Sequence, residues 1–146
     1  MIVTFCGHRE VAETQEVSEW LLKVTEQLIM EGAEEFLLGG KGHFDFMAAE
    51  AVRALKKKYP HIRSTLVLAY LNHQPVAWEK ELYDGTMYPP LEGVPHRFAI
   101  ARRNAYMVAE ADVLVAYVQY GFGGAAKTLQ LARQKKKRVL LYPETV

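Results

Sequence analysis

The sequence predicts an α/β fold: a three-layer sandwich around a mainly parallel sheet of about five strands. Two observations predict it. Five short runs are almost continuously apolar, and segments with helical spacing of apolar residues lie between them. Strands buried on both faces have such continuous runs, and alternation of strand and helix is typical of right-handed crossovers. At 146 residues, we expect one domain covering residues 1–146.

The elements follow from these patterns. The expected strands are Ile2–Cys6, Glu35–Leu38, Ser64–Tyr70, Val113–Val118 and Val139–Tyr142. Apolar residues recur at spacings of three and four in the expected helices, which are Glu13–Met30, Phe44–Tyr59, Arg97–Glu110 and Ala125–Lys136. From Leu71 to Pro95 the chain has four prolines and no regular period. We expect a long functional loop there.

Composition excludes several classes of protein. The net charge is +1, so no global field attracts nucleic acid or a membrane. Cys6 is the only cysteine, which excludes an internal disulfide and a cysteine-based metal cluster. The N-terminus lacks a signal-peptide pattern, and no apolar run approaches membrane-spanning length. We therefore expect a cytoplasmic protein with no membrane partner.

Glycine turns follow three of the five expected strands. They are Gly7 with His8 and Arg9; Gly39, Gly40, Lys41 and Gly42 with Asp45; and Gly121, Gly123 and Gly124 with Lys127. In an open parallel sheet, ligands bind in the crevice outside the carboxyl ends of the strands. Glycine lets backbone N–H groups approach an anion, and the following helix N-terminus adds partial positive charge. Such turns also need glycine for their geometry alone, but three of them on one edge predict a phosphate-binding site.

Polar side chains near these turns are candidate ligand contacts. Arg9 suits a phosphate or carboxylate, and His8 suits proton transfer or hydrogen bonding, although His8 also fits a capping or packing role. Asp45 fits either the first turn of a helix or the hydroxyls of a ribose. Arg103 and Asn104 lie on a helix with a basic face. A solvated face is the ordinary interpretation, yet we expect part of it at the rim of the site.

Several kinds of chemistry are disfavoured. Neither long glycine turn is a Walker A motif, which disfavours Mg-dependent phosphoryl transfer. The five histidines have no paired ligand spacing, so we expect no metal site, and we expect no cofactor. The chain has only two serines, Ser18 and Ser64, and both positions look structural. No Ser/His/Asp set is indicated.

The whole pattern resembles the SLOG superfamily of Rossmann-like nucleotide-ligand binding domains. The resemblance rests on FCGHRE, GGKGHFDFMAAEAV, LAYL, YDGTMYPPLEGVPHRFAIARRNAYMV and VAYVQYGFGGAAKTL, within residues 2–142. It is strongest to a small bacterial and phage branch of single-domain proteins. Wider relatives are the Lonely Guy phosphoribohydrolases, which cleave the N-glycosidic bond of nucleotides, the DNA-processing protein A family, and the nucleotide-signal sensors of antiphage systems.

Two phosphoribohydrolase elements have altered counterparts in this chain. Residues 103–107, RNAYM, resemble an Arg-Lys-x-x-Met element, with Asn104 in place of lysine. Residues 120–127 resemble Pro-Gly-Gly-x-Gly-Thr-x-x-Glu, with Ala126 and Lys127 where acidic residues are expected. Hydrolysis of an N-glycosidic bond needs a carboxylate. The changes weigh against that activity, while Lys127 favours phosphate binding.

The leading hypothesis is a binding module that senses or sequesters a nucleotide or nucleotide-derived small molecule. Its phosphate would lie against the glycine turns with Arg9, Arg103 and Lys127. The 71–95 loop would close over the base and offer three aromatic side chains for stacking, Trp78, Tyr83 and Tyr88. The alternative is a nucleoside or nucleotide N-glycosidase, whose candidate catalytic residues are Asp45, Asp84 and Arg103.

The basic clusters of the sequence bear on whether a nucleic acid is a partner. Basic clusters at 53–58 and 133–138 fall at expected helix ends, where cations complement the helix dipole. We therefore do not expect a nucleic-acid partner, and DNA binding stands as a third hypothesis, marked by steep salt dependence.

Val139–Tyr142 is a candidate edge strand, and the helix containing RFAIARRNAYM could pack against a second copy. The hypothesis of a homo-oligomer is left open.

Overall fold

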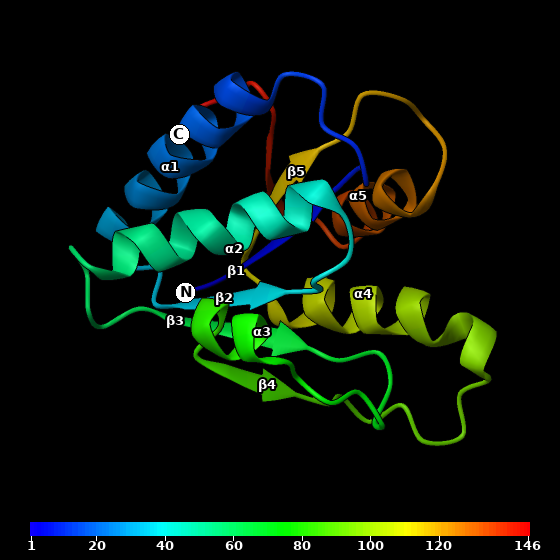
Figure 1. The fold of residues 1–146 in the computed structure, drawn as a ribbon. Coiled ribbons are helices and arrows are strands. Elements are labelled where there is room, and N and C mark those ends of the chain that lie inside the picture. The colour runs from blue at the N-terminus through cyan, green and yellow to red at the C-terminus, as the bar shows by residue number, and fades with distance from the viewer.

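Six parallel strands form a single sheet in the computed structural model, which describes residues 1–146 (Figure 1). The strands are β1 (Ile2–Gly7), β2 (Glu35–Leu38), β3 (Arg63–Val67), β4 (Gly85–Met87), β5 (Val113–Tyr117) and β6 (Arg138–Leu141). Their order is β4-β3-β2-β1-β5-β6, and every neighbouring pair is parallel. The predicted α/β class is confirmed, with one strand more than expected.

Helices cover both faces of the sheet, as the three-layer prediction requires. On one face lie α1 (Thr14–Met30) and α2 (His43–Lys56), and on the other lie α4 (Ala99–Glu110) and α5 (Gly124–Gln134) (Figure 1). The first face holds a cluster of 26 buried residues, whereas α4, α5 and the strands beneath them share a cluster of six. None of the helices combines the length and apolar character needed to cross a membrane.

The 71–95 segment differs from the expected irregular loop. It contains the short helix α3 (Ala77–Leu82) and the edge strand β4, and the 3₁₀ helix η1 (His96–Phe98) follows it before α4. The side chain of Asp84, just before β4, links this segment to the neighbouring elements. Its carboxylate accepts hydrogen bonds from the Ser64 backbone N–H at 2.8 Å and from Lys56 Nζ at 2.6 Å. The three residues of β4 pair with β3, but a strand of this length is too short to show a hydrophobic period.

The topology concentrates the strand ends at one edge. Because all strands run in parallel, their carboxyl ends lie together, and the chain passes from β1 outward to β4 before returning to β5 on the other side of β1. This reversal between β1 and β5 is the switch point at which doubly wound sheets open a crevice. Strand β6 is at the edge, as predicted, whereas pairing with a second copy stays a prediction.

Candidate functional site

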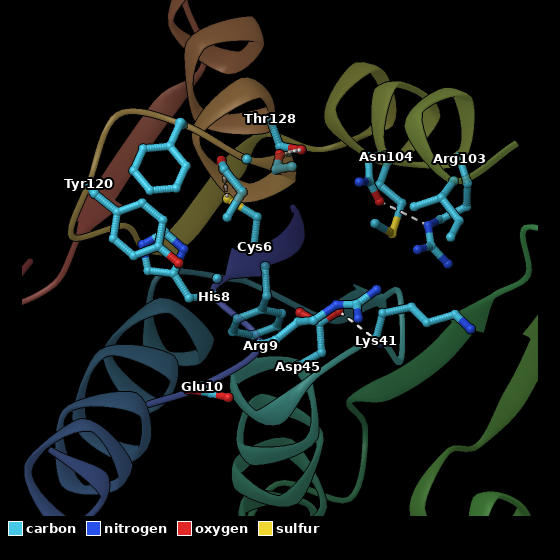
Figure 2. A pocket seen from close by; sticks show the side chains of 18 residues that line it. Cys6, His8, Arg9, Glu10, Lys41, Asp45, Arg103, Asn104, Tyr120 and Thr128 are labelled. Atoms are coloured by element: carbon cyan, nitrogen blue, oxygen red, sulfur yellow. Dashed lines mark hydrogen bonds between the residues drawn. The ribbon is translucent and has the colours of Figure 1, made fainter. Parts of the chain in front are cut away.

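A cavity of about 510 Å³ opens at the switch point, a size typical of small-molecule sites (Figure 2). Its wall comes from the loops after β1, β2 and β5 and from the facing side of α4. Nine of the residues predicted from the sequence line it: Gly7, His8, Arg9, Lys41, Asp45, Arg103, Asn104, Gly123 and Gly124. The three glycine turns therefore meet at one edge, as expected.

Six other predicted residues do not line this cavity: Gly39, Gly40, Gly42, Gly121, Lys127 and Asp84. Lys127 is exposed on α5. Asp84 lies at the start of β4, in ion pairs with Arg53 at 3.2 Å and Lys56 at 2.6 Å. Burial opposes ionisation of Asp84, but its hydrogen bonds from Lys56 and Ser64 outweigh burial and lower its pKa. Asp84 thus makes structural ion pairs outside this cavity, and a catalytic role for it stays a prediction.

Packing explains several of the predicted glycines without any ligand. A Cβ atom on Gly7 would overlap the ring of Phe44 beneath it. Gly40 and Gly42 have φ angles of +69° and +92°, which side-chain-bearing residues rarely adopt. Gly39 lies between two charged side chains, since an added Cβ would be 3.0 Å from Arg103 Cζ and 3.3 Å from Asp45 Oδ2. Gly39, Gly40 and Gly42 therefore shape the site without lining the cavity, whereas Gly7 does both.

The glycines of the β5–α5 loop have a different setting. An added Cβ on Gly121, Gly123 or Gly124 would meet no atom within 4 Å, and only Gly123 has a positive φ, +91°. Neither packing nor backbone strain therefore requires glycine at 121 or 124. Gly124 lies on the cavity wall and leaves the backbone there accessible.

The N-terminus of α5 supplies hydrogen-bond donors to the cavity. Its first bond joins the Lys127 N–H to the Gly123 carbonyl at 3.1 Å, and no side chain caps the helix. The N–H groups of Gly124, Ala125 and Ala126 have no protein acceptor. Such groups, with the helix dipole, form a favourable environment for an anion.

Arg103 is a buried cation that joins three elements at the cavity. Its Nη1 donates to the Gly39 and Val67 carbonyls at 2.9 and 3.0 Å, at the ends of β2 and β3. Its Nε donates to Asn104 Oδ1 at 2.9 Å. The remaining nitrogen, Nη2, has no acceptor in the protein. Arg103 therefore clamps the sheet edge and still has two N–H donors for a ligand.

Asp45 is a buried carboxyl in the first turn of α2. Its Oδ2 accepts the Lys41 backbone N–H at 3.1 Å. Burial raises the pKa of Asp45 to about 7, although the Lys41 hydrogen bond and the charge of Arg103 both act in the opposite direction. In Figure 2, Asp45 lies beside Arg9 and Lys41, and the Arg103 guanidinium is its neighbour on the other side of Gly39. The site therefore holds a carboxyl group that titrates near neutral pH.

His8 belongs to a stack of three rings at the other end of the cavity. The Gln119 N–H donates to His8 Nε2 at 2.8 Å, so the ring hydrogen is on Nδ1. Burial lowers the pKa of His8, which keeps the imidazole neutral. Its ring stacks on Tyr120 at 3.8 Å between centroids and 6° between planes, and Tyr120 stacks on Phe122 at 4.4 Å. His8 thus packs against an aromatic pair as well as facing the cavity.

The aromatic side chains expected from the 71–95 loop are not at this cavity, since no residue of that loop lines it. Trp78 packs edge-on against Phe46 on the exposed side of α2. Tyr83 is buried, and its hydroxyl approaches Gly40. The expectation that this loop covers the base is corrected: β4 and α3 hold it against the sheet edge.

Sequence reasoning missed the aromatic pair Tyr120 and Phe122, which lines the cavity with Cys6, Glu10, Ile100, Met107 and Thr128. A signal was present in YGFGG, where glycines flank an aromatic residue. Loops carry binding residues more often than the elements they join, so aromatic residues on this loop are candidates for ligand contact.

Comparison with known proteins gives one family match. The model described as the YspA SLOG family matches residues 8–87, which include the Gly39–Gly42 turn and the His8 and Arg9 that follow Gly7. The UPF0398 protein BH1768 of Halalkalibacterium halodurans is 28% identical over 125 residues, covering 76% of this chain and 64% of that protein. The chain therefore spans somewhat less than two thirds of that curated relative.

Solved structures of the same fold have low sequence identity. DNA-processing protein A from Helicobacter pylori, a protein with a single-stranded DNA binding mode, has a TM-score of 0.70 and 16% identity, covering 99% of this chain and 68% of its own. The molybdenum cofactor carrier protein from Chlamydomonas reinhardtii has a TM-score of 0.61 and 19% identity, covering 96% and 75%. At such identities, the likeness shows a shared Rossmann-like fold.

Proposed function

The chain belongs to the YspA SLOG family, and on that premise we propose that it binds a nucleotide or nucleotide-derived signal in the switch-point cavity. The observation that carries the proposal is a cluster of donors without acceptors in one cavity. The N–H groups at the start of α5 and Nη2 of Arg103 all lack partners within the protein. A phosphate group satisfies several such donors at once.

Charge supports the same ligand. Arg9 and Lys41 are exposed residues on the cavity wall, and with Arg103 they place three cations around it. The carboxylates there are Glu10 and Asp45, and the raised pKa of Asp45 leaves it partly neutral at pH 7. The cavity is therefore cationic on balance, although the net charge of the chain is only +1.

A second candidate function, N-glycosidic hydrolysis, is favoured by Asp45 alone. A carboxyl with a pKa of about 7 is matched to acid–base catalysis at neutral pH. In this mechanism Asp45 would stabilise the oxocarbenium-like centre or activate water, and its neutralisation would stop the release of free base. Incubation with nucleoside monophosphates separates the two candidates: a binder leaves them intact, whereas an enzyme yields base and ribose phosphate that the D45N variant does not produce.

The experiment that tests binding uses isothermal titration calorimetry. The four ribonucleoside 5′-monophosphates are titrated into the protein and into the Arg9→Gln and Lys41→Gln variants. Each variant removes one cation from the cavity wall, so we expect affinity to fall about 10-fold per substitution, the value of a hydrogen bond to a charged group. A d(T)₁₂ oligonucleotide, titrated in parallel, tests single-stranded DNA as the ligand instead.

Lys127→Gln is the matched control, because this exposed lysine lies on α5 but not on the cavity wall. We expect it to leave nucleotide affinity unchanged. Equal losses in Lys41→Gln and Lys127→Gln would mean that general charge, not the cavity, attracts the ligand. Binding of d(T)₁₂ without binding of any mononucleotide would overturn the proposal in favour of nucleic acid.

A further inference from the structure

We infer that Phe122, backed by Tyr120 and His8, is the platform on which the base of the ligand stacks, so that the ligand class is a base-bearing nucleotide and not a sugar phosphate. The inference rests on the proposed function, because it adds a base contact beside the proposed phosphate contact. It assigns recognition to a loop that the sequence did not single out for this purpose.

The exposure of these rings is the first observation. Phe122 is 72% exposed and Tyr120 is 47% exposed, although both are large apolar side chains. Exposed rings are ordinary when they are scattered, but these two are stacked on each other and line the same cavity. One face of Phe122 packs on Tyr120, and its exposure leaves the other available to a planar group.

The rigidity of the support is the second observation. His8 is fixed by the bond from the Gln119 N–H, and its ring is nearly parallel to that of Tyr120. Tyr117 packs edge-on against His8 from the core at 5.8 Å between centroids. The column therefore runs from a buried tyrosine to an exposed phenylalanine, which reduces the entropy lost when a base stacks at its end.

The position of the platform is the third observation. Phe122 precedes the Gly123–Gly124 turn, so the aromatic ring and the unpaired N–H groups belong to one short loop. A single ligand in the cavity would contact both, with its phosphate at the helix N-terminus and its base against the ring. Figure 2 shows Tyr120 at the α5 side of the cavity, and Arg103 and Asn104 on the facing helix.

The test compares two probes that differ by the base alone, adenosine 5′-monophosphate and ribose 5-phosphate. Isothermal titration calorimetry measures both on the wild-type protein and on two variants, Phe122→Leu and Phe98→Leu. Leucine keeps an apolar side chain but removes the flat ring. Phe98 is the matched control, because it is 47% exposed at the start of α4 and does not line the cavity.

The wild-type protein should bind adenosine monophosphate at least about 5-fold more tightly than ribose 5-phosphate, because stacking of a base on an aromatic ring contributes a factor of about 5 or more. Phe122→Leu should remove most of this preference and leave the affinity for ribose 5-phosphate unchanged. Phe98→Leu should leave both affinities unchanged.

Equal wild-type affinity for the two probes would overturn the platform and leave the phosphate site standing. A preference for adenosine monophosphate over ribose 5-phosphate that persists in Phe122→Leu would also overturn the platform. Failure of both probes to bind would instead refute the proposed nucleotide site itself.

Discussion

Replacing Asp45 with asparagine should stabilise the protein at neutral pH and have little effect in acid. In the folded state the pKa of this buried carboxyl is about 7, against an ordinary value of 3.8. The folded protein therefore holds a proton that the unfolded chain releases, and stability falls as pH rises from about 4 to 7. A difference of about 3 between the folded and unfolded pKa values corresponds to a loss of about 4 kcal/mol in the free energy of unfolding, and this loss is complete above pH 7. Asparagine has nearly the same shape, stays neutral and keeps an acceptor for the Lys41 N–H.

Urea unfolding of the two proteins at pH 4.5, 6 and 8 measures this difference. The stability advantage of D45N should grow steadily over that range and reach several kcal/mol at pH 8. Two parallel stability curves would refute the reasoning, because they would mean that Asp45 titrates alike in the folded and unfolded states.

Three further predictions concern groups around the same sheet edge. Asp84→Asn should do the opposite of D45N and destabilise the protein at neutral pH, since the pKa of Asp84 is lowered; the loss, read from urea midpoints, should vanish in acid. Relative to His8→Gln, the wild-type protein should lose stability as pH falls below 6.5, because the folded state keeps His8 neutral and the unfolded chain protonates it, while the contribution of Asp45 is common to both proteins. Gly7→Ala should cost about 1–3 kcal/mol or more, because the new methyl group overlaps the Phe44 ring; an unchanged melting temperature would contradict this packing.

Most of the fold was predictable because it rests on local patterns. The apolar runs at 2–6, 35–38 and 113–118 match β1, β2 and β5 to within a residue or so, since buried parallel strands need continuous apolar sequence. Their parallel arrangement also brought the glycine turns to one edge, as expected. Strand β4 escaped notice because it has only three residues, and its pairing with β3 and the hydrogen bond between Asp84 and Ser64 join distant parts of the chain.

The candidate site was predictable as a location but less so in its parts. Gly124 and Arg103 were found because a glycine turn and an arginine-rich helix have sequence signatures. The stack of Tyr120 on His8 joins two residues more than a hundred positions apart, and no local pattern encodes such a contact. For the same reason, Tyr83 seemed free to cover a base, whereas tertiary packing buries it.

The most direct test of phosphate binding at the start of α5 compares Gly124→Ala with Gly121→Ala by calorimetric titration of the nucleotide monophosphate that binds most tightly. Both glycines have ordinary φ angles and open space around an added Cβ, so neither substitution should reduce stability. Only Gly124 lines the cavity. We predict that Gly124→Ala weakens binding about 10-fold or more, from crowding of the anion, while Gly121→Ala does not. Equal affinity in both variants and the wild-type protein would contradict it.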